Sequence, residues 1–177
     1  MKRRLALAFA LAGALAITAS GCASAPDYSA ETPLLDLKTY FNGELLAHGI
    51  FTDRSGKVVR RFVVQMTGTW QGKEGVLDER FTYSDGKTER RVWRLTDLGG
   101  GRWSGRADDV VGEAVGVASG NALNWKYTLK LPVDDKVYEV QFDDWMYLMD
   151  DKVMLNKAVM SKFGFRLGEV TLSFYKK

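Results

Sequence analysis

The chain has 177 residues, a formal net charge of +3 and 46% hydrophobic residues. Residues 2–4 (Lys-Arg-Arg) account for the whole charge excess, because the chain from residue 22 onward carries 22 basic and 22 acidic residues. Such a composition excludes a disordered chain and leaves no basic surface for nucleic acid. One cysteine excludes a disulfide framework, and one histidine argues against zinc, so neither a metal nor another cofactor is expected.

Residues 1–21 predict an export signal peptide. Three cations precede a charge-free apolar run over residues 5–19, which is shorter than the roughly 20 residues that span a bilayer. Residues 19–22 (Ala-Ser-Gly-Cys) resemble a bacterial lipobox, and Cys22 is the only cysteine of the chain. We therefore expect lipid attachment at Cys22. The alternatives are ordinary signal cleavage and, more weakly, a transmembrane anchor.

Residues 22–33 are small and polar, as expected of a lipidated tether. The residue after Cys22 is Ala23 and not aspartate, which by the enteric sorting rule implies release to the outer membrane. The expected location is therefore the periplasmic face of the outer membrane, where the lipid would be the membrane contact. Protein partners cannot be predicted from these residues.

Residues 34–177 predict one all-β domain, because short apolar–polar alternations follow one another between turn signals. Ten sequential strands most economically close into an antiparallel up-and-down barrel, which removes exposed edges. A two-sheet β-sandwich is the alternative. Thr32 and Pro33 favour one short helix before the first strand, with Thr32 as its cap, and such a helix would plug one barrel end. The expected strands are 43–53, 57–70, 75–83, 87–97, 101–109, 112–118, 122–132, 136–149, 152–160 and 164–175.

Strand parity predicts which side chains face inward. Over 122–132 the odd positions are apolar, including Trp125 and Tyr127, and over 136–149 the even positions are apolar, with Asp144 among them. A two-residue turn at Asp134-Asp135 makes these two faces agree. A second two-residue turn at Asp150-Asp151 would place Lys157 directly opposite Asp144.

The same parity argument applies to the earlier strands. A three-residue loop at 84–86 pairs Glu79 with Arg91 and Leu77 with Trp93. The same type of loop at 54–56 sets His48 opposite Phe62 and Ile50 opposite Arg60. The interior is therefore expected to be aromatic with a few charges. The candidate ligand-binding residues are His48, Arg60, Glu79, Arg91, Trp93, Trp125, Tyr127, Asp144 and Lys157.

These inward charges have two interpretations. Cross-strand ion pairs often fix the register of a barrel without contacting any ligand. In the functional interpretation one of them anchors the polar end of an apolar ligand, and Arg60 or Arg91 is the expected partner of a carboxylate.

No catalytic residues are predicted. The sequence contains no GxSxG, P-loop or GxGxxG motif, and His48 has no identifiable nucleophile. Asp143 and Asp144 are adjacent on a strand and so point to opposite faces. Asp108, Asp109 and Glu113 lack EF-hand spacing and fit a turn better than a calcium site.

Long segments of the chain carry a family resemblance. From about Leu35 to Phe174, the chain resembles the proteobacterial lipoprotein family labelled domain of unknown function 3833. The resemblance implies a lipoprotein signal and a lipocalin-like β fold, and it implies no established activity. That family tends to have tryptophan at the position of His48, which argues against an essential catalytic histidine. The segments are YFNGELLAHGIFTDRSGKVVRRF, GTWQGKEGVLDERFTYSDGK, RRVWRL, ADDVVGEAVGVASGNALNWKYTL and FDDWMYLMDDKVMLNKAVMSKFGFRLGEVTL.

Three functions follow as hypotheses. The first is a non-enzymatic, lipid-anchored barrel that binds or carries an apolar molecule such as a fatty acid or a modified lipid. The second is a structural or envelope-assembly lipoprotein that acts through its outer surface, and the third is an enzyme on a lipid. An open cavity with unpaired charges favours binding, whereas an interior packed solid with Trp and Tyr favours the surface role.

Overall fold

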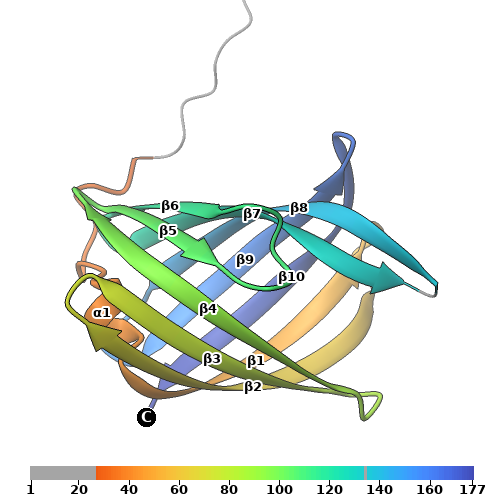
Figure 1. Cartoon of the computed structure of the whole chain (residues 1–177), viewed down its shortest axis with the longest axis horizontal. Coiled ribbons are helices and arrows are strands. Elements are labelled where there is room, and N and C mark those ends of the chain that lie inside the picture. The colour runs from red at the N-terminus through yellow and green to blue at the C-terminus, as the bar shows by residue number, and fades with distance from the viewer. Residues whose placement is uncertain (1–26, 134) are drawn as a thin grey trace, which may run out of the picture.

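The structure is a computed structural model that describes residues 27–133 and 135–177. The expected signal peptide, the attachment residue Cys22 and the first part of the tether lie outside the described residues. Ten antiparallel strands form one closed barrel, and one short helix lies at its end (Figure 1). The strands are β1 (Gly43–Asp53), β2 (Val58–Gln71), β3 (Glu74–Tyr83), β4 (Thr88–Gly99), β5 (Arg102–Arg106), β6 (Ala114–Ser119), β7 (Ala122–Val133), β8 (Lys136–Leu148), β9 (Val153–Lys162) and β10 (Phe165–Lys176).

Each strand pairs with the next in the chain, and β1 pairs with β10 to close the ring. This order confirms the predicted up-and-down barrel and excludes the β-sandwich. Full closure leaves no edge strand, so the backbone groups of both terminal strands find partners. The architecture is consistent with a lipocalin-like fold. None of the helices in residues 27–133 and 135–177 has the length and apolar character needed to cross a bilayer.

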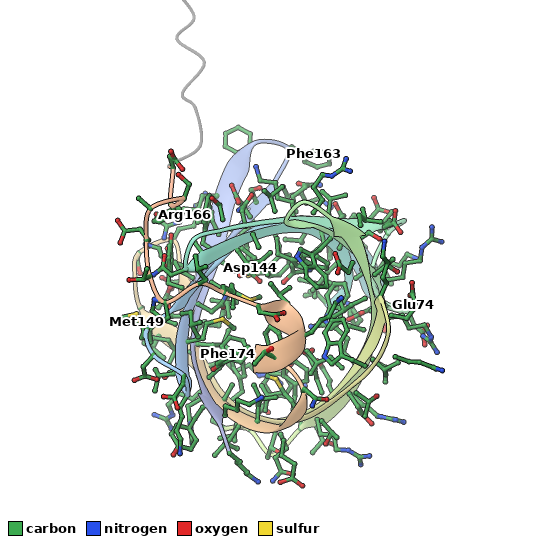
Figure 2. All side chains as sticks on the ribbon, turned by 90° about the vertical axis from the view of Figure 1, so that its left-hand side faces the viewer. Glu74, Asp144, Met149, Phe163, Arg166 and Phe174 are labelled. Carbon is green, nitrogen blue, oxygen red and sulfur yellow. The ribbon has the colours of Figure 1, made fainter. Side chains whose placement is uncertain are left out.

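The helix α1 (Leu37–Tyr40) closes one end of the barrel, as Figure 2 shows from that side. Its cap is Asp36, whose carboxylate accepts hydrogen bonds from the backbone N–H groups of Lys38 and Thr39. The prediction of Thr32 as the cap is therefore wrong. The helix begins at Leu37, where the apolar side chain can point into the barrel, and it is held there through Leu37 and Tyr40, which are both buried.

Two contacts fix the helix against the strands. The Lys176 ammonium, from the end of β10, donates to the backbone carbonyl oxygens of Thr39, Tyr40 and Asn42 at 2.6–2.8 Å. A cation at these carbonyls compensates the negative end of the helix. On β2, a Cβ atom at Gly68 would overlap the backbone carbonyl of Phe41, so only glycine allows the chain after α1 to cross this close.

Most predictions of which side chains point into the barrel were correct. Glu79 pairs with Arg91 and Leu77 with Trp93 across β3 and β4, as expected. The predicted faces of β7 and β8 are also confirmed, since Trp125, Tyr127 and the Asp144 side chain all line the interior.

Two predicted registers were wrong, each by one residue. Between β8 and β9 the loop has three residues and not two: the Met149 N–H donates to the Val153 carbonyl, and Asp150 accepts from the N–H groups of Lys152 and Val153. Ala158 therefore lies opposite Asp144, and Lys157 lies opposite Trp145. The shift turns Lys157 to the outside of the barrel.

The second error arises from a β-bulge in the β1–β2 ladder. The register shifts between Phe51 and Thr52, so the extra residue sets Phe51 and not Ile50 opposite Arg60. Beyond the bulge, Gly49 faces Phe62 and the His48 side chain is exposed on the outer face. Neither His48 nor Lys157 is an interior residue.

Candidate ligand-binding site

The barrel encloses a cavity of about 1190 Å³. It extends from Leu37 and Phe41 at the α1 end to Val59, Val133 and Leu167 near the hairpins at the other end. Ligand pockets usually measure about 300–1,000 Å³, so this space is large enough for a lipid-sized molecule. Of the nine candidate residues, seven line it: Arg60, Glu79, Arg91, Trp93, Trp125, Tyr127 and Asp144.

An aromatic cluster forms one wall of the cavity. The Trp93 ring meets the rings of Trp125 and Tyr127 edge to face at centroid distances of 5.7 and 5.5 Å. The Tyr127 ring in turn stacks on Phe142 at 4.9 Å. Trp125 fits because Gly105 and Gly116 lie beneath its indole, where any Cβ atom would overlap the ring. The wall is therefore rigid and apolar, and the Tyr127 hydroxyl is a polar group on it.

Arg91 is neutralised within the protein. Its guanidinium binds the Asp109 carboxylate at 2.7 Å and approaches Glu79 only to 3.9 Å. Burial raises the pKa of Glu79 to about 7, an effect that the Arg91 charge opposes and the charges of Asp109 and Asp144 reinforce. Arg91 is therefore already paired, mainly with Asp109.

Arg60 is also paired, closer to the mouth. Its guanidinium binds the Asp85 carboxylate at 3.1 Å and lies 3.5 Å from the centroid of the Tyr83 ring. Tyr83 donates to Glu89 at 2.7 Å. These contacts hold Arg60 against the wall near the hairpin end, so neither arginine presents an uncompensated charge to the cavity.

Asp144 has no cationic partner among the described residues. It is 6% exposed and lies inside the ring of strands, as Figure 2 shows. Its carboxylate accepts hydrogen bonds from the Asn156 amide and from the Tyr127 hydroxyl, the latter at 3.4 Å. Burial raises the pKa of Asp144 to about 7, against the opposing effect of these two donors.

Two site residues were missed by the sequence analysis. Asn156 faces inward because the β8–β9 loop has three residues. The sequence signal for this loop length was Asp150, whose carboxylate accepts from the N–H groups of Lys152 and Val153. Asp109 was assigned to a turn, and it does lie between β5 and β6. Its pairing with Arg91 depends on how that loop folds back over β4, which no local pattern reveals.

The mouth of the cavity is rimmed by exposed apolar side chains. They lie on three hairpins, β1–β2, β7–β8 and β9–β10, at the end away from α1 (Figure 1). Phe163 and Phe165 are the most exposed, at 85% and 71%. The Lys162 ammonium lies 4.8 Å from the Tyr138 ring and 5.0 Å from the Phe163 ring, which links two of these hairpins. The other members are Val58, Val59, Val133, Val137, Tyr138 and Leu167.

Metal ligation was considered at the acidic residues. Within residues 27–133 and 135–177, no group of three or more His, Cys, Asp or Glu side chains lies close enough to hold an ion. Asp109 and Glu113 are paired instead with Arg91 and Arg106. The arrangement inside the barrel therefore offers an apolar space with carboxyl, amide and phenol groups.

The chain matches the family described as "Protein of unknown function (DUF3833)" over residues 15–176, and it belongs to that family. No curated protein matches the sequence. The match covers every strand of the barrel and the helix that closes it. Membership of this family of unknown function, expected from the sequence segments, is thus confirmed.

Proposed function

We propose that this member of the DUF3833 family is a lipid-anchored protein of the bacterial envelope that binds an apolar ligand, such as a fatty acid or a modified lipid, inside its barrel. The proposal assigns the cavity a binding role and no catalytic one. It places the anchor at Cys22 and the protein on the periplasmic face of the outer membrane, on the sequence grounds given above.

The observation that carries this proposal is the cavity itself. An interior of about 1190 Å³ is costly to leave empty, because the side chains that line it lose packing contacts. Burying an acyl chain there would contribute about 0.8 kcal/mol per methylene before ordering costs. The alternative of a structural lipoprotein acting through its outer surface predicts an interior packed solid, so the cavity favours binding.

The mouth provides a route for such a ligand. The apolar rim lies on three of the hairpins at the open end of the cavity and would let a hydrocarbon chain leave a lipid surface without crossing water. The described chain enters the barrel at the opposite end: Leu35 donates to the Gly120 carbonyl, and Tyr28 packs on Trp145 and Tyr147. An anchor at Cys22 would therefore leave the mouth unobstructed.

Native mass spectrometry of the protein purified from its own host tests the proposal, because a co-purified lipid would appear as added mass. Titration with lipid analogues, followed by tryptophan emission, provides a second measurement. Ala158→Trp would fill part of the cavity, since Ala158 is buried and lines it. Lys157→Trp, next to it on the outer face, is the matched control. We expect binding to weaken in the first variant only.

Absence of co-purified lipid, together with no saturable binding at tens of micromolar, would overturn the proposal. Equal weakening by Ala158→Trp and Lys157→Trp would place any binding outside the barrel and would equally contradict it. Circular dichroism of both variants establishes that the barrel is retained.

A further inference from the structure

Two buried polar groups that line the cavity lack a hydrogen-bond partner among the described residues: Arg60 Nε, closer to the mouth, and Asn156 Oδ1, deeper in the barrel. Asn156 is 2% exposed and lines the cavity beside Asp144. Its amide nitrogen donates both to Asp144 and to the backbone carbonyl of Trp145, the latter at 3.2 Å. Its side-chain oxygen Oδ1 has no hydrogen-bond partner among the described residues. A buried acceptor without a donor destabilises the empty protein, and a ligand that supplied a donor would remove that cost.

The groups around this oxygen are mostly acceptors as well. The Asp144 carboxylate binds the amide nitrogen of the same side chain, and the Tyr127 hydroxyl donates to Asp144. The two inward-facing arginines bind other carboxylates: Arg91 binds Asp109, and Arg60, closer to the mouth, binds Asp85. Lys130 also lines the cavity, on β7 near the β7–β8 hairpin. Lys162 lies between the rings of Tyr138 and Phe163, at the mouth. The region around Asp144 and Asn156 therefore has no free hydrogen-bond donor and no free positive charge, among the described residues, that could bind an anion.

We propose that Asp144 and Asn156 form a head-group site that selects ligands whose polar end donates hydrogen bonds, an ammonium or a hydroxyl, and that rejects carboxylates. This inference rests on the proposed function and narrows it: the apolar ligand inside the barrel is kept, and the fatty acid is excluded in favour of a lipid with a donor head group. It replaces the expectation from the sequence that Arg60 or Arg91 receives a ligand carboxylate.

The geometry gives the ligand an orientation. The donor group contacts Asn156 Oδ1 and the Asp144 carboxylate, which lie toward the middle of the barrel. The chain then runs past Phe142 and Met160, which line the cavity on the same two strands on the mouth side of this pair. A carboxylate in the same place would meet the Asp144 carboxylate and the Asn156 oxygen with no donor of its own.

The test compares three ligands with one chain length and different heads: dodecylamine, dodecanol and dodecanoate. Each is titrated into the purified protein at about pH 8.5, above the pKa of about 7 of Asp144, so that the carboxyl is ionised, and displacement of a fluorescent lipid analogue is followed. We expect the amine and the alcohol to bind at least about tenfold more tightly than the acid, as one charge-assisted or buried hydrogen bond allows. If all three bind equally, or if the acid binds best, the head-group site is refuted while the proposed function stands. If the analogue binds and none of the three displaces it, the head-group site is likewise refuted; if the analogue itself shows no saturable binding, the proposed function fails.

Asn156→Leu provides the variant test. It removes the unpartnered oxygen at similar side-chain size, and it should weaken binding of the amine and the alcohol, which keep only their contact with Asp144, while leaving the affinity for the acid unchanged. Asn124→Leu is the matched control, because Asn124 lies on the outer face of β7 and binds Asp143. Affinities for the amine and the alcohol that are the same in Asn156→Leu as in the parent protein would mean that water satisfies this oxygen, and the inference would be wrong.

Asp144→Asn keeps the test decisive if Asn156→Leu does not fold. This variant retains the shape of the side chain and removes its charge. It should reduce the affinity for dodecylamine by about tenfold, because the charge-assisted part of the hydrogen bond is lost, and should leave dodecanol nearly unaffected. An unchanged ranking of amine over acid in this variant would contradict the role of Asp144.

Discussion

Arg91 lies directly opposite Glu79 in the β3–β4 ladder, yet its guanidinium binds Asp109 from the β5–β6 segment more closely, at 2.7 Å against 3.9 Å. The strand register thus brings two charges together, and a loop supplies the stronger partner. The consequence is that the Glu79 carboxyl is only weakly compensated, in agreement with its raised pKa.

A double-mutant cycle tests this arrangement. Because Asp109 makes the closer contact, the Arg91→Ala/Asp109→Ala pair should show a coupling of about 1 kcal/mol or more in the free energy of unfolding. The coupling of Arg91→Ala with Glu79→Ala should be smaller. Urea denaturation of the single and double variants measures both values. A larger coupling for Glu79 would show that the loop contact with Asp109 contributes little.

The pH dependence of stability provides a second prediction. The pKa of Asp144 in the folded protein is about 7, above its ordinary value of 3.8, so the folded state binds more protons than the unfolded state between these values. Its contribution to stability is therefore lost as the pH rises through this window. Asp144→Asn resembles the neutral form and should be more stable than the parent protein above about pH 7, and it should flatten the pH profile.

Thermal unfolding between pH 5 and 8 measures this effect. The flattening should be partial, because burial raises the pKa of Glu79 to about 7 as well. Asp151→Asn, at an exposed position in the β8–β9 loop, is the control and should leave the slope unchanged. An Asp144→Asn variant with the slope of the parent protein would mean that Asp144 does not titrate in this range.

The fold was largely predictable because period-two patterning and turn residues are local signals. The β7 and β8 faces, for example, follow from the alternation of Trp125 and Tyr127 with polar residues. The register was less predictable because it depends on one-residue differences. The loop after Met149 and the bulge after Phe51 each moved a predicted interior residue, Lys157 and His48, to the outside.

The site itself was predictable only in part. Parity identifies inward-facing charges such as Arg60 and Arg91, but it does not reveal whether another residue already compensates them. Asp85 and Asp109, which bind these arginines, lie in connections between strands. The position of a loop side chain depends on tertiary contacts, so the sequence could not show that Asp85 and Asp109 compensate the two arginines and that Asn156 leaves an acceptor deep in the cavity.

Lipid attachment gives a third prediction, outside the described residues. If Cys22 carries the anchor, Cys22→Ser should abolish incorporation of labelled palmitate and release the protein from the membrane fraction. The physical reason is that several acyl chains bind a bilayer far more strongly than one marginal chain. Ser24→Ala, two residues away, is the control and should be labelled normally. Palmitate labelling that persists in Cys22→Ser would contradict the assignment of the anchor.

The apolar rim gives the last prediction, which separates the route of the ligand from its binding. Phe163 and Phe165 lie on the β9–β10 hairpin beyond the ring of strands, and neither of them lines the cavity (Figure 2 labels Phe163). Replacing both with serine should therefore leave the equilibrium affinity for a lipid analogue unchanged.

The same double variant should take up the analogue from phospholipid vesicles about tenfold more slowly, because each Phe that contacts a lipid surface contributes about 1.5–3 kcal/mol when fully buried. Stopped-flow transfer of a fluorescent analogue from vesicles measures the rate, and titration in buffer measures the affinity. Val115→Ser/Val117→Ser is the matched control, since both valines are exposed on β6. Equal uptake rates for the two double variants would mean that the rim has no part in ligand entry.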